Sequence, residues 1–340
     1  MLLKLNIDHS SLMKKILYTL AALLISTAAS AADIIVKVEY NGNSAVVTIP
    51  SEASSYVQLE SDKSSSHVKL LQTSTTAKNP GEIIYQLSGE SEDGEFYLTG
   101  EYKATIQLNG LTLANPDSSA VHIKDGKRIK VSMAANTVNT LKDGATDISS
   151  KGCFHCKGHT EFVGKGTLNV SSSYAHAIYS KEYVTVKNCT INVTGAKKDG
   201  IHCQEYCVIA SGEVNIKDVE DDGIQVELKD SVATGQTLNH EDENSGNFYM
   251  TGGTLAINDL GGYCIKTYGS IAFSGGNQNF DTSNIKDYNT TAINGVVNSK
   301  SGNRQYYYDL GGRRMPNDAM LPRGIYIVKE GDKTRKIVKR

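Results

Sequence analysis

Tryptophan is absent from the 340 residues, proline occurs only 5 times, and the net charge at pH 7 is −2. A chain so nearly neutral lacks the general basic surface that binds phosphate backbones, so nucleic acid is not an expected partner. Glycine is frequent, with 31 residues, and the 18 tyrosines outnumber the 6 phenylalanines. Together with a hydrophobic content of 39%, this composition favours a folded all-β chain with many turns.

No apolar stretch is long enough to cross a membrane as a helix. The longest, residues 16–25, follows two lysines and leads to the small-x-small motif Ala29-Ser30-Ala31, which is the layout of a secretory signal peptide. We therefore predict a signal peptide over residues 1–31, with Met13 as the true start and Ala32 as the first residue of the mature chain. The protein is expected to be exported.

A five-residue motif recurs along the chain at a nearly constant interval. Its small second residue lies at positions 153, 177, 200 and 223, in steps of 24, 23 and 23, and the next step of 41 is 23 plus an insertion over 229–246. A fixed period with loop insertions is typical of a solenoid. The copies are Ser119-Ala-Val-His-Ile, Gly152-Cys-Phe-His-Cys, His176-Ala-Ile-Tyr-Ser, Asp199-Gly-Ile-His-Cys, Asp222-Gly-Ile-Gln-Val and Tyr263-Cys-Ile-Lys-Thr.

Two more alternating motifs recur with the same steps, such as Gly166-Thr-Leu-Asn-Val and Tyr183-Val-Thr-Val. Three short strands in each period of about 23 residues, separated by turn residues, predict a three-faced parallel β-helix. Because parallel crossovers are nearly always right-handed, we expect a right-handed helix. A β-rich N-terminal region over 32–100 is expected to cover its first coil, with a hairpin at Asn41-Gly42-Asn43.

Alternation along each strand separates inward from outward side chains. Ile201 and Cys203 are predicted to point into the core, whereas His202 points outward. Asn169, Asn192 and Asn215 form a second outward ladder. The column around His202 is either a decorated exposed face or a platform for a long polar ligand; its expected members are His122, His155, Tyr179, His202, Gln225 and Lys266.

Carboxylates recur at the turn before the outward column. Asp199 and Asp222 occupy the same position in successive coils, so their Cα atoms should lie about 4.8 Å apart. Glu182 and Glu205 are expected to stack in the same way on the far side of the strand. Like charges placed opposite each other destabilise a sheet, which favours a compensating cation, and hard oxygen ligands suit Ca²⁺. Solvated turn carboxylates balanced by Lys197 and Lys198 are the alternative. The predicted metal ligands are Asp199, Asp221, Asp222 and Glu220.

Six cysteines in an exported chain raise three possibilities. Inward positions favour buried free thiols that pack as small hydrophobic groups. A local Cys203/Cys207 or Cys153/Cys156 bridge is the second possibility, and a zinc site with neighbouring histidines is the third.

Catalytic motifs are harder to find. Lys198, beside Asp199, could act as the base of a β-elimination, although nothing distinguishes it from an ordinary turn lysine. No Ser-His-Asp, phosphate-loop or HExxH pattern is present.

Residues 35–280 resemble the carbohydrate-binding β-helix family whose clostridial representative binds polygalacturonate. The resemblance rests on motifs such as Gly100-Glu-Tyr-Lys-Ala-Thr, Leu108-Asn-Gly-Leu-Thr-Leu and Asp199-Gly-Ile-His-Cys. It implies an architecture similar to that of pectate lyases, Ca²⁺ among turn aspartates, and binding of acidic polysaccharide without clear lyase activity. The last coil departs from the pattern, because Gly261-Gly-Tyr-Cys has no aspartate.

The C-terminus resembles the sorting domain of the type IX secretion system of Bacteroidetes. Tyr308-Asp-Leu-Gly-Gly-Arg-Arg and Pro322-Arg-Gly-Ile-Tyr-Ile-Val-Lys carry this resemblance. We predict a β-helix domain over 101–280, a linker over 281–303 and a sorting domain over 304–340. A last hairpin that caps the solenoid is the alternative for the tail.

These observations predict an exported, monomeric protein that binds uronate-containing polysaccharide with Ca²⁺ at the cell surface or outside the cell. Secretion machinery would be its partner through the tail. A pectate-lyase-like polysaccharide lyase on the same fold, or a structural and adhesive surface solenoid, are the alternatives. The expected ligand-binding residues are His155, Tyr179, Lys198, His202 and Gln225.

Overall fold

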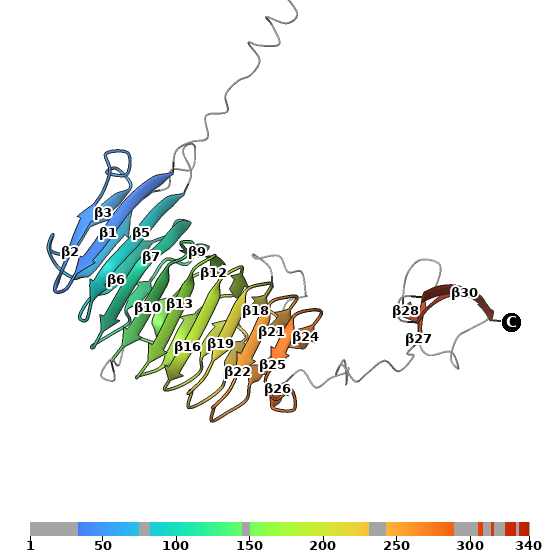
Figure 1. Cartoon of the computed structure of the whole chain (residues 1–340). Helices are drawn as coiled ribbons and strands as arrows, with labels where there is room; N and C mark the ends of the chain where they lie inside the picture. The colour runs from blue at the N-terminus through green and yellow to red at the C-terminus, as the bar shows by residue number, and fades with distance from the viewer. Residues whose placement is uncertain are drawn as a thin grey trace, which may run out of the picture. The chain divides into compact units, whose positions relative to one another are not determined.

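A computed structural model describes residues 33–74, 82–144, 150–230, 243–288 and four strands between 305 and 339. Every regular element in these residues is a β-strand (Figure 1), which confirms the all-β prediction. None of the described residues lies in a helix long and apolar enough to cross a membrane. The predicted signal peptide falls outside the described residues.

The long strand β7 (Ala104–Asn115) organises the larger sheet. Its first half pairs in parallel with β9 (Ile129–Met133), and its second half pairs in parallel with β10 (Val138–Asp143). Two series of parallel strands therefore start from one strand. The first series continues from β9 through β12 (Thr160–Gly164), β15 (Val184–Lys187), β18 (Tyr206–Ile209), β21 (Asn247–Met250) and β24 (Ile271–Phe273).

The second series continues from β10 and is seen side by side in Figure 1. Its members are β13 (Thr167–Ser172), β16 (Thr190–Ala196), β19 (Glu213–Ile216), β22 (Thr254–Ile257) and β25 (Asn277–Asn279).

A separate sheet forms the third series. It runs through β3 (Val57–Leu59), β4 (His67–Gln72), β6 (Glu95–Gly100), β8 (Val121–Ile123), β11 (Gly152–Cys156), β14 (His176–Ser180), β17 (Ile201–Gln204), β20 (Ile224–Glu227), β23 (Ile265–Thr267) and β26 (Ile285–Asp287).

The pairing register agrees with the sequence period. Ile178 pairs with Ile201 and Ile201 pairs with Ile224, so the partners are one period of the repeat apart each time. Thr190 pairs with Glu213 at the same separation. The chain is therefore a β-solenoid in which equivalent positions of the repeat lie side by side on neighbouring strands.

The N-terminal region combines antiparallel and parallel pairing. The predicted hairpin is present, because β1 (Ile34–Asn41) and β2 (Ser44–Thr48) pair antiparallel around a two-residue turn with Gly42 at φ +61°. However, β1 also pairs in parallel with β5 (Ile83–Ser91), and β4 pairs in parallel with β6. The parallel stack thus begins well before residue 101, and at the other end it reaches β26, past residue 280.

The interior follows the predicted alternation. Ile201, Cys203 and Phe154 are buried in one continuous apolar core. On the second series the Asn ladder is present: Asn215 donates to Asn192 at 2.9 Å, and Asn192 donates to Asn169 at 2.8 Å. Each of these bonds joins one coil to the next, so the ladder holds neighbouring coils in register.

All six cysteines are free and buried. Burial raises the pKa of Cys156 to about 12, which keeps its thiol protonated and unreactive near neutral pH. The prediction of buried thiols is confirmed. In the described residues, neither alternative, a local disulfide or a zinc site at the cysteines, is present.

The C-terminal residues 291–340 form a separate compact unit. Its four strands pair antiparallel in the order β28 (Arg314–Met315), β27 (Gln305–Tyr308), β29 (Gly324–Glu330) and β30 (Lys333–Lys339). The described strands of the tail therefore form a sheet of their own.

Candidate functional site

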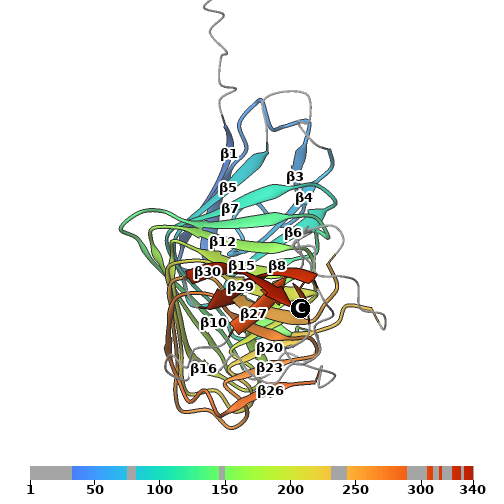
Figure 2. The same ribbon diagram turned by 90° about the vertical axis from the view of Figure 1, so that its right-hand side faces the viewer.

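One row of side chains crosses the third series of strands. The register places one member on each strand from β4 to β26, and strands β20, β23 and β26 of this series are labelled in Figure 2. At about 4.8 Å per strand the row is nearly 40 Å long, which suits a chain-like ligand. This outward row consists of Lys69, Tyr97, His122, His155, Tyr179, His202, Gln225, Lys266 and Lys286.

The outward row is less exposed than predicted. His122, Tyr179, His202 and Gln225 are all less than 9% exposed, whereas His155 is half-buried. The rings cover one another: His122 stacks on His155 with centroids 4.4 Å apart, and Tyr179 stacks on His202 at 5.3 Å. The prediction of an exposed column is therefore wrong for these four buried members of the row. Ring faces used in stacking are not available to a sugar, and ring edges remain.

Lysines accompany the tyrosines of the outward row. The ammonium group of Lys69 lies 5.6 Å from the centre of the Tyr97 ring, and that of Lys124 lies 5.5 Å from the same ring. Lys151 lies 5.0 Å from the centre of Tyr179. Cations within about 6 Å of a ring face are attracted to it, so these contacts fix positive charges along the row.

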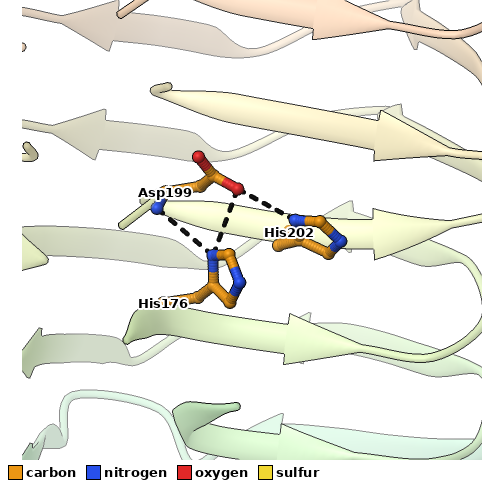
Figure 3. A group of neighbouring side chains, drawn as sticks. All are labelled: His176, Asp199 and His202. Atoms are coloured by element: carbon orange, nitrogen blue, oxygen red, sulfur yellow. Dashed lines mark hydrogen bonds and ion pairs between the residues drawn. The ribbon is translucent and has the colours of Figure 1, made fainter. Parts of the chain in front are cut away.

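Asp199 lies at the centre of a polar cluster with two histidines (Figure 3). Its Oδ2 atom is 2.9 Å from Nδ1 of His202 and 3.1 Å from Nδ1 of His176. All three residues are buried, with exposed fractions of 1%, 7% and 8%. Burial opposes ionisation of Asp199, but the two histidines outweigh it and hold the pKa of the carboxyl below its usual range. Asp199 is thus a buried carboxylate.

The neighbouring coil adds two more carboxylates. Oxygen atoms of Asp199, Asp221 and Asp222 lie within 4.8 Å of one another, so the predicted convergence is found. Lys266 forms an ion pair with Asp222 at 2.8 Å and supplies a cation from within the chain. Burial and the charges of Asp199 and Asp222 raise the pKa of Asp221, which shows that negative charge there is not fully balanced.

The backbone of the last full coil lies close to this carboxylate group. A Cβ atom on Gly262 would lie 2.4 Å from Oδ1 of Asp222 and 3.0 Å from Oδ1 of Asp221. Glycine at this position therefore leaves the carboxylates room that any side chain would fill. Three converging oxygen ligands fit a hard cation, with Lys266 as its competitor.

Two predicted site residues lie apart from this group. Glu220 is exposed and forms an ion pair with Lys197 at 2.6 Å, because the repeat places the two residues one period apart. The structure therefore does not bring Glu220 to the other carboxylates. Lys198 is exposed; burial, with a smaller contribution from the charge of Lys198, lowers the pKa of His176.

A second ionic cluster lies between the third series and the first. Lys229 contacts Glu182 at 2.6 Å and Glu205 at 3.0 Å, and Nε2 of His159 lies 2.8 Å from Oε2 of Glu182. Burial lowers the pKa of His159, but the two glutamates outweigh it and raise the value to about 9. Nε2 of His159 also lies 3.4 Å from Oε2 of Glu205, so one ring nitrogen lies between the Oε2 atoms of both glutamates. We call these four residues the inner ionic cluster.

Glu205 adopts an unusual backbone conformation. Among the described residues, the other non-glycine residues with positive φ are Asn or Asp, which tolerate this region, whereas Glu205 has φ +67°. It is the single residue between β17 and β18. The inner ionic cluster holds its side chain, so tertiary contacts and not local preference maintain this turn.

An open depression of about 390 Å³ lies beside these clusters. It is lined by Glu227, Leu228, Lys229, Asp230 and Tyr268. Tyr268 is 46% exposed, and Tyr288 on the next coil is 49% exposed with its ring centre 5.3 Å away. Unlike the stacked rings of the outward row, these two tyrosines present a large part of their surface to solvent.

The sequence prediction missed His176, His159 and Lys229. His176 was detectable, because it occupies the same repeat position as Asp199. His159 stacks on Tyr183 at 4.4 Å, but its charged partners, Glu182 and Glu205, come from two other coils. Lys229 lies at the start of the insertion, where no repeat predicts a position.

Three comparisons relate the chain to known proteins. A family model described as a carbohydrate-binding domain-containing protein matches residues 72–307, which is more than half of the chain. A carbohydrate-binding domain-containing protein of Acetivibrio thermocellus is 25% identical over 104 residues. That match covers 28% of this chain and 36% of the relative, so the chain corresponds to about a third of the relative's length.

A solved structure is also similar. The polysaccharide lyase-like protein from C. thermocellum, studied as a gadolinium derivative, superimposes with a TM-score of 0.54 at 18% identity. The match covers 75% of this chain and 100% of that chain, and it shows a shared fold. On the evidence of the matching family model, the chain belongs to the carbohydrate-binding domain family.

Proposed function

We propose that this protein binds an acidic, uronate-containing polysaccharide along the outward row. The observation that carries this proposal is the row itself, which aligns nine side chains with lysines at both ends and lysines over its tyrosine rings. A polyanionic sugar chain needs spaced positive charges and hydrogen-bond donors over tens of ångströms. His155, Tyr179, His202 and Gln225 would contribute ring edges and an amide, and exposed Lys198 a further ammonium group.

Stacking on sugar rings is better assigned to the end of the row. Tyr268 and Tyr288 are exposed, and Lys286 of the outward row lies 5.2 Å from the centre of the Tyr288 ring. An aromatic surface next to a cation offers both an apolar face and a partner for a carboxylate. We include this pair in the proposed binding surface.

Calcium is part of the proposal. Asp199, Asp221 and Asp222 would hold the ion, which when bound supplies positive charge between protein and sugar carboxylates. The unbalanced charge at Asp221 and the space beside Gly262 support this assignment. We also infer that the three strand series form the faces of a right-handed helix with one sequence period per coil, because register partners are one period apart.

The binding test uses retention of the mature protein in gels that contain polygalacturonate. We expect retention to require Ca²⁺, and Asp221→Asn to weaken it roughly tenfold by removing one of three carboxylate ligands. Asp218→Asn is the matched control, because this exposed aspartate has φ +58° and asparagine tolerates that conformation. Equal retention of both variants would contradict the calcium assignment.

The same incubation separates the alternatives. The lyase-like fold suggests a polysaccharide lyase with Lys198 as its base. Such an enzyme would produce unsaturated uronide ends, and the absorbance of the solution would increase. Retention without this increase supports a binding protein. Absence of retention on any acidic glycan would favour a structural or adhesive solenoid.

We also propose export to the cell surface through the C-terminal tail. The antiparallel sheet β27–β30 belongs to its own compact unit, which suits a separable sorting domain. In a host with type IX secretion machinery, deletion of residues 304–340 should leave the protein in the periplasm, whereas the full chain should be accessible to protease on intact cells. Surface exposure of the truncated protein would contradict this role.

A further inference from the structure

The histidine side of Asp199 has properties that the calcium proposal does not use. Oδ1 of Asp199 accepts a hydrogen bond from the backbone N–H of Asp222 at 3.1 Å and faces the neighbouring coil. Oδ2 faces the opposite way, toward His176 and His202, as Figure 3 shows. The two oxygens of one carboxylate therefore belong to two chemically different environments.

The two contacts of Nδ1 of His176 cannot both be hydrogen bonds. Its Nδ1 atom lies 3.2 Å from the backbone nitrogen of Asp199, whose N–H it accepts, and 3.1 Å from Oδ2 of the same residue. A ring nitrogen that accepts a hydrogen bond carries no proton to donate. Nδ1 therefore brings a lone pair, and not a proton, to within contact distance of the carboxylate oxygen. Because this nitrogen has one lone pair, a cation bound by both atoms would take the place of the backbone N–H at Nδ1.

The second histidine is held in the orientation of a ligand. Nδ1 of His202 faces Asp199, while its Nε2 lies 3.5 Å from Glu227, whose other oxygen accepts a hydrogen bond from Gln225. Tyr179 stacks on the ring with the two planes 20° apart. Metal-binding histidines commonly have their second nitrogen directed at a carboxylate in this way, which fixes the tautomer and the ring orientation.

We propose that Nδ1 of His176, Oδ2 of Asp199 and Nδ1 of His202 bind a transition-metal ion of the Zn²⁺ class. The three atoms lie within 4.8 Å of one another. Zinc ligands at about 2.0–2.1 Å in tetrahedral geometry are separated by about 3.3 Å, close to the separations of 2.9 and 3.1 Å found here. Two imidazoles and one carboxylate select Zn²⁺, Co²⁺ or Ni²⁺ over Ca²⁺, which prefers six to eight oxygens.

Such a site would hold together two coils of the solenoid. His176 lies on β14, His202 lies on β17, and Asp199 lies two residues before β17 begins. Three protein ligands leave the fourth tetrahedral position for water or for a carboxylate of a bound ligand. This site shares only Asp199 with the proposed calcium site and does not depend on the polysaccharide proposal.

The experiment is a calorimetric titration of the metal-free mature protein with Zn²⁺ in the presence of excess Ca²⁺. The absorption spectrum of the Co²⁺-loaded protein is the second readout. We expect one equivalent of Zn²⁺ to bind and Co²⁺ to develop the intense visible bands of tetrahedral coordination. His176→Gln and His202→Gln should each weaken Zn²⁺ binding by roughly 100-fold or more, since each removes one of three ligands.

Two control variants make the result specific. His155→Gln alters the neighbouring histidine of the outward row and should leave Zn²⁺ affinity within about twofold, as should Asp221→Asn. Circular dichroism of each metal-free variant establishes that it is folded. Absence of stoichiometric Zn²⁺ binding by the wild-type protein, or unchanged affinity in both folded glutamine variants, would overturn the proposal. Loss of polygalacturonate retention with intact Zn²⁺ binding would bear on the proposed function alone.

Discussion

Replacing Lys229 with methionine should destabilise the solenoid by about 2–3 kcal/mol, because it removes the ammonium group that lies between two buried carboxylates. Glu182 and Glu205 have side chains only 11% and 9% exposed, and Lys229 contacts both. Methionine keeps the apolar stem of lysine and removes the charge. The expected loss of stability is smaller than for breaking a fully buried ion pair, because the Lys229 side chain is 31% exposed.

Lys197 offers a matched control for this prediction. Its ion pair with Glu220 has the same 2.6 Å separation as the Lys229–Glu182 pair, but its two side chains are 55% and 61% exposed. Exposed pairs contribute little, so Lys197→Met should change stability by less than about 0.5 kcal/mol. The same distance in two environments thus isolates the effect of burial.

The measurement combines the urea midpoint with amide hydrogen exchange, because neighbouring coils of a solenoid can open separately. Lys229→Met should increase exchange most in β17, β18 and β21, the strands around the inner ionic cluster. Equal destabilisation by the two methionine variants would show that burial is not the cause.

The stability of the wild-type protein should fall by about 3 kcal/mol as the pH rises from about 6.5 to above 9. The pKa of His159 is about 9 in the folded protein, against an ordinary value of 6.5. The contribution of protonated His159 is therefore complete below pH 6.5 and is lost as the pH rises through 9. Each pH unit between the two values is worth about 1.4 kcal/mol, which gives the size of the effect.

His159→Gln should remove most of this pH dependence. A smaller slope of the same sign should remain from His202, because Asp199 and Glu227 outweigh its burial and raise its pKa. His67→Gln is the control, because the ion pair of His67 with Asp93 has a similar distance of 3.0 Å but is exposed to solvent. Urea unfolding at a series of pH values provides the comparison. If the free energy of unfolding of His159→Gln falls with pH as steeply as that of the wild-type protein, groups other than His159 cause the pH dependence.

The inner ionic cluster also shows how far prediction of the site could reach. The period predicted that Glu182 and Glu205 would stack, and it predicted the need for a cation. The cations in the structure are His159 and Lys229, and the place of Lys229 after β20 follows from an insertion that no repeat describes. The same holds at Asp222, where Lys266 of the next coil forms the ion pair. Spacing predicts which like charges meet, but not which long side chain neutralises them.

The outward row shows a second limit of prediction from the sequence, which concerns the burial of side chains. Alternation correctly placed His202 outside the apolar core, because inward and outward positions follow directly from the pleat of a strand. It could not predict that the side chain would be buried, because burial depends on ring rotamers. Rows of rings on strands about 4.8 Å apart can close onto one another, and here His122 with His155 and Tyr179 with His202 do so.

The sequence by itself determined the all-β class, the coil register, the buried thiols and the Asn ladder, since each of these follows from a period and an alternation that every coil repeats. The tertiary structure alone decided that His176 joins His202 at Asp199, that Glu220 lies apart, and that Lys229 lies between two glutamates. The physical reason is that the local period determines where the backbone of each coil lies. The partner of a polar side chain depends instead on which charged groups of several coils and loops lie within its length.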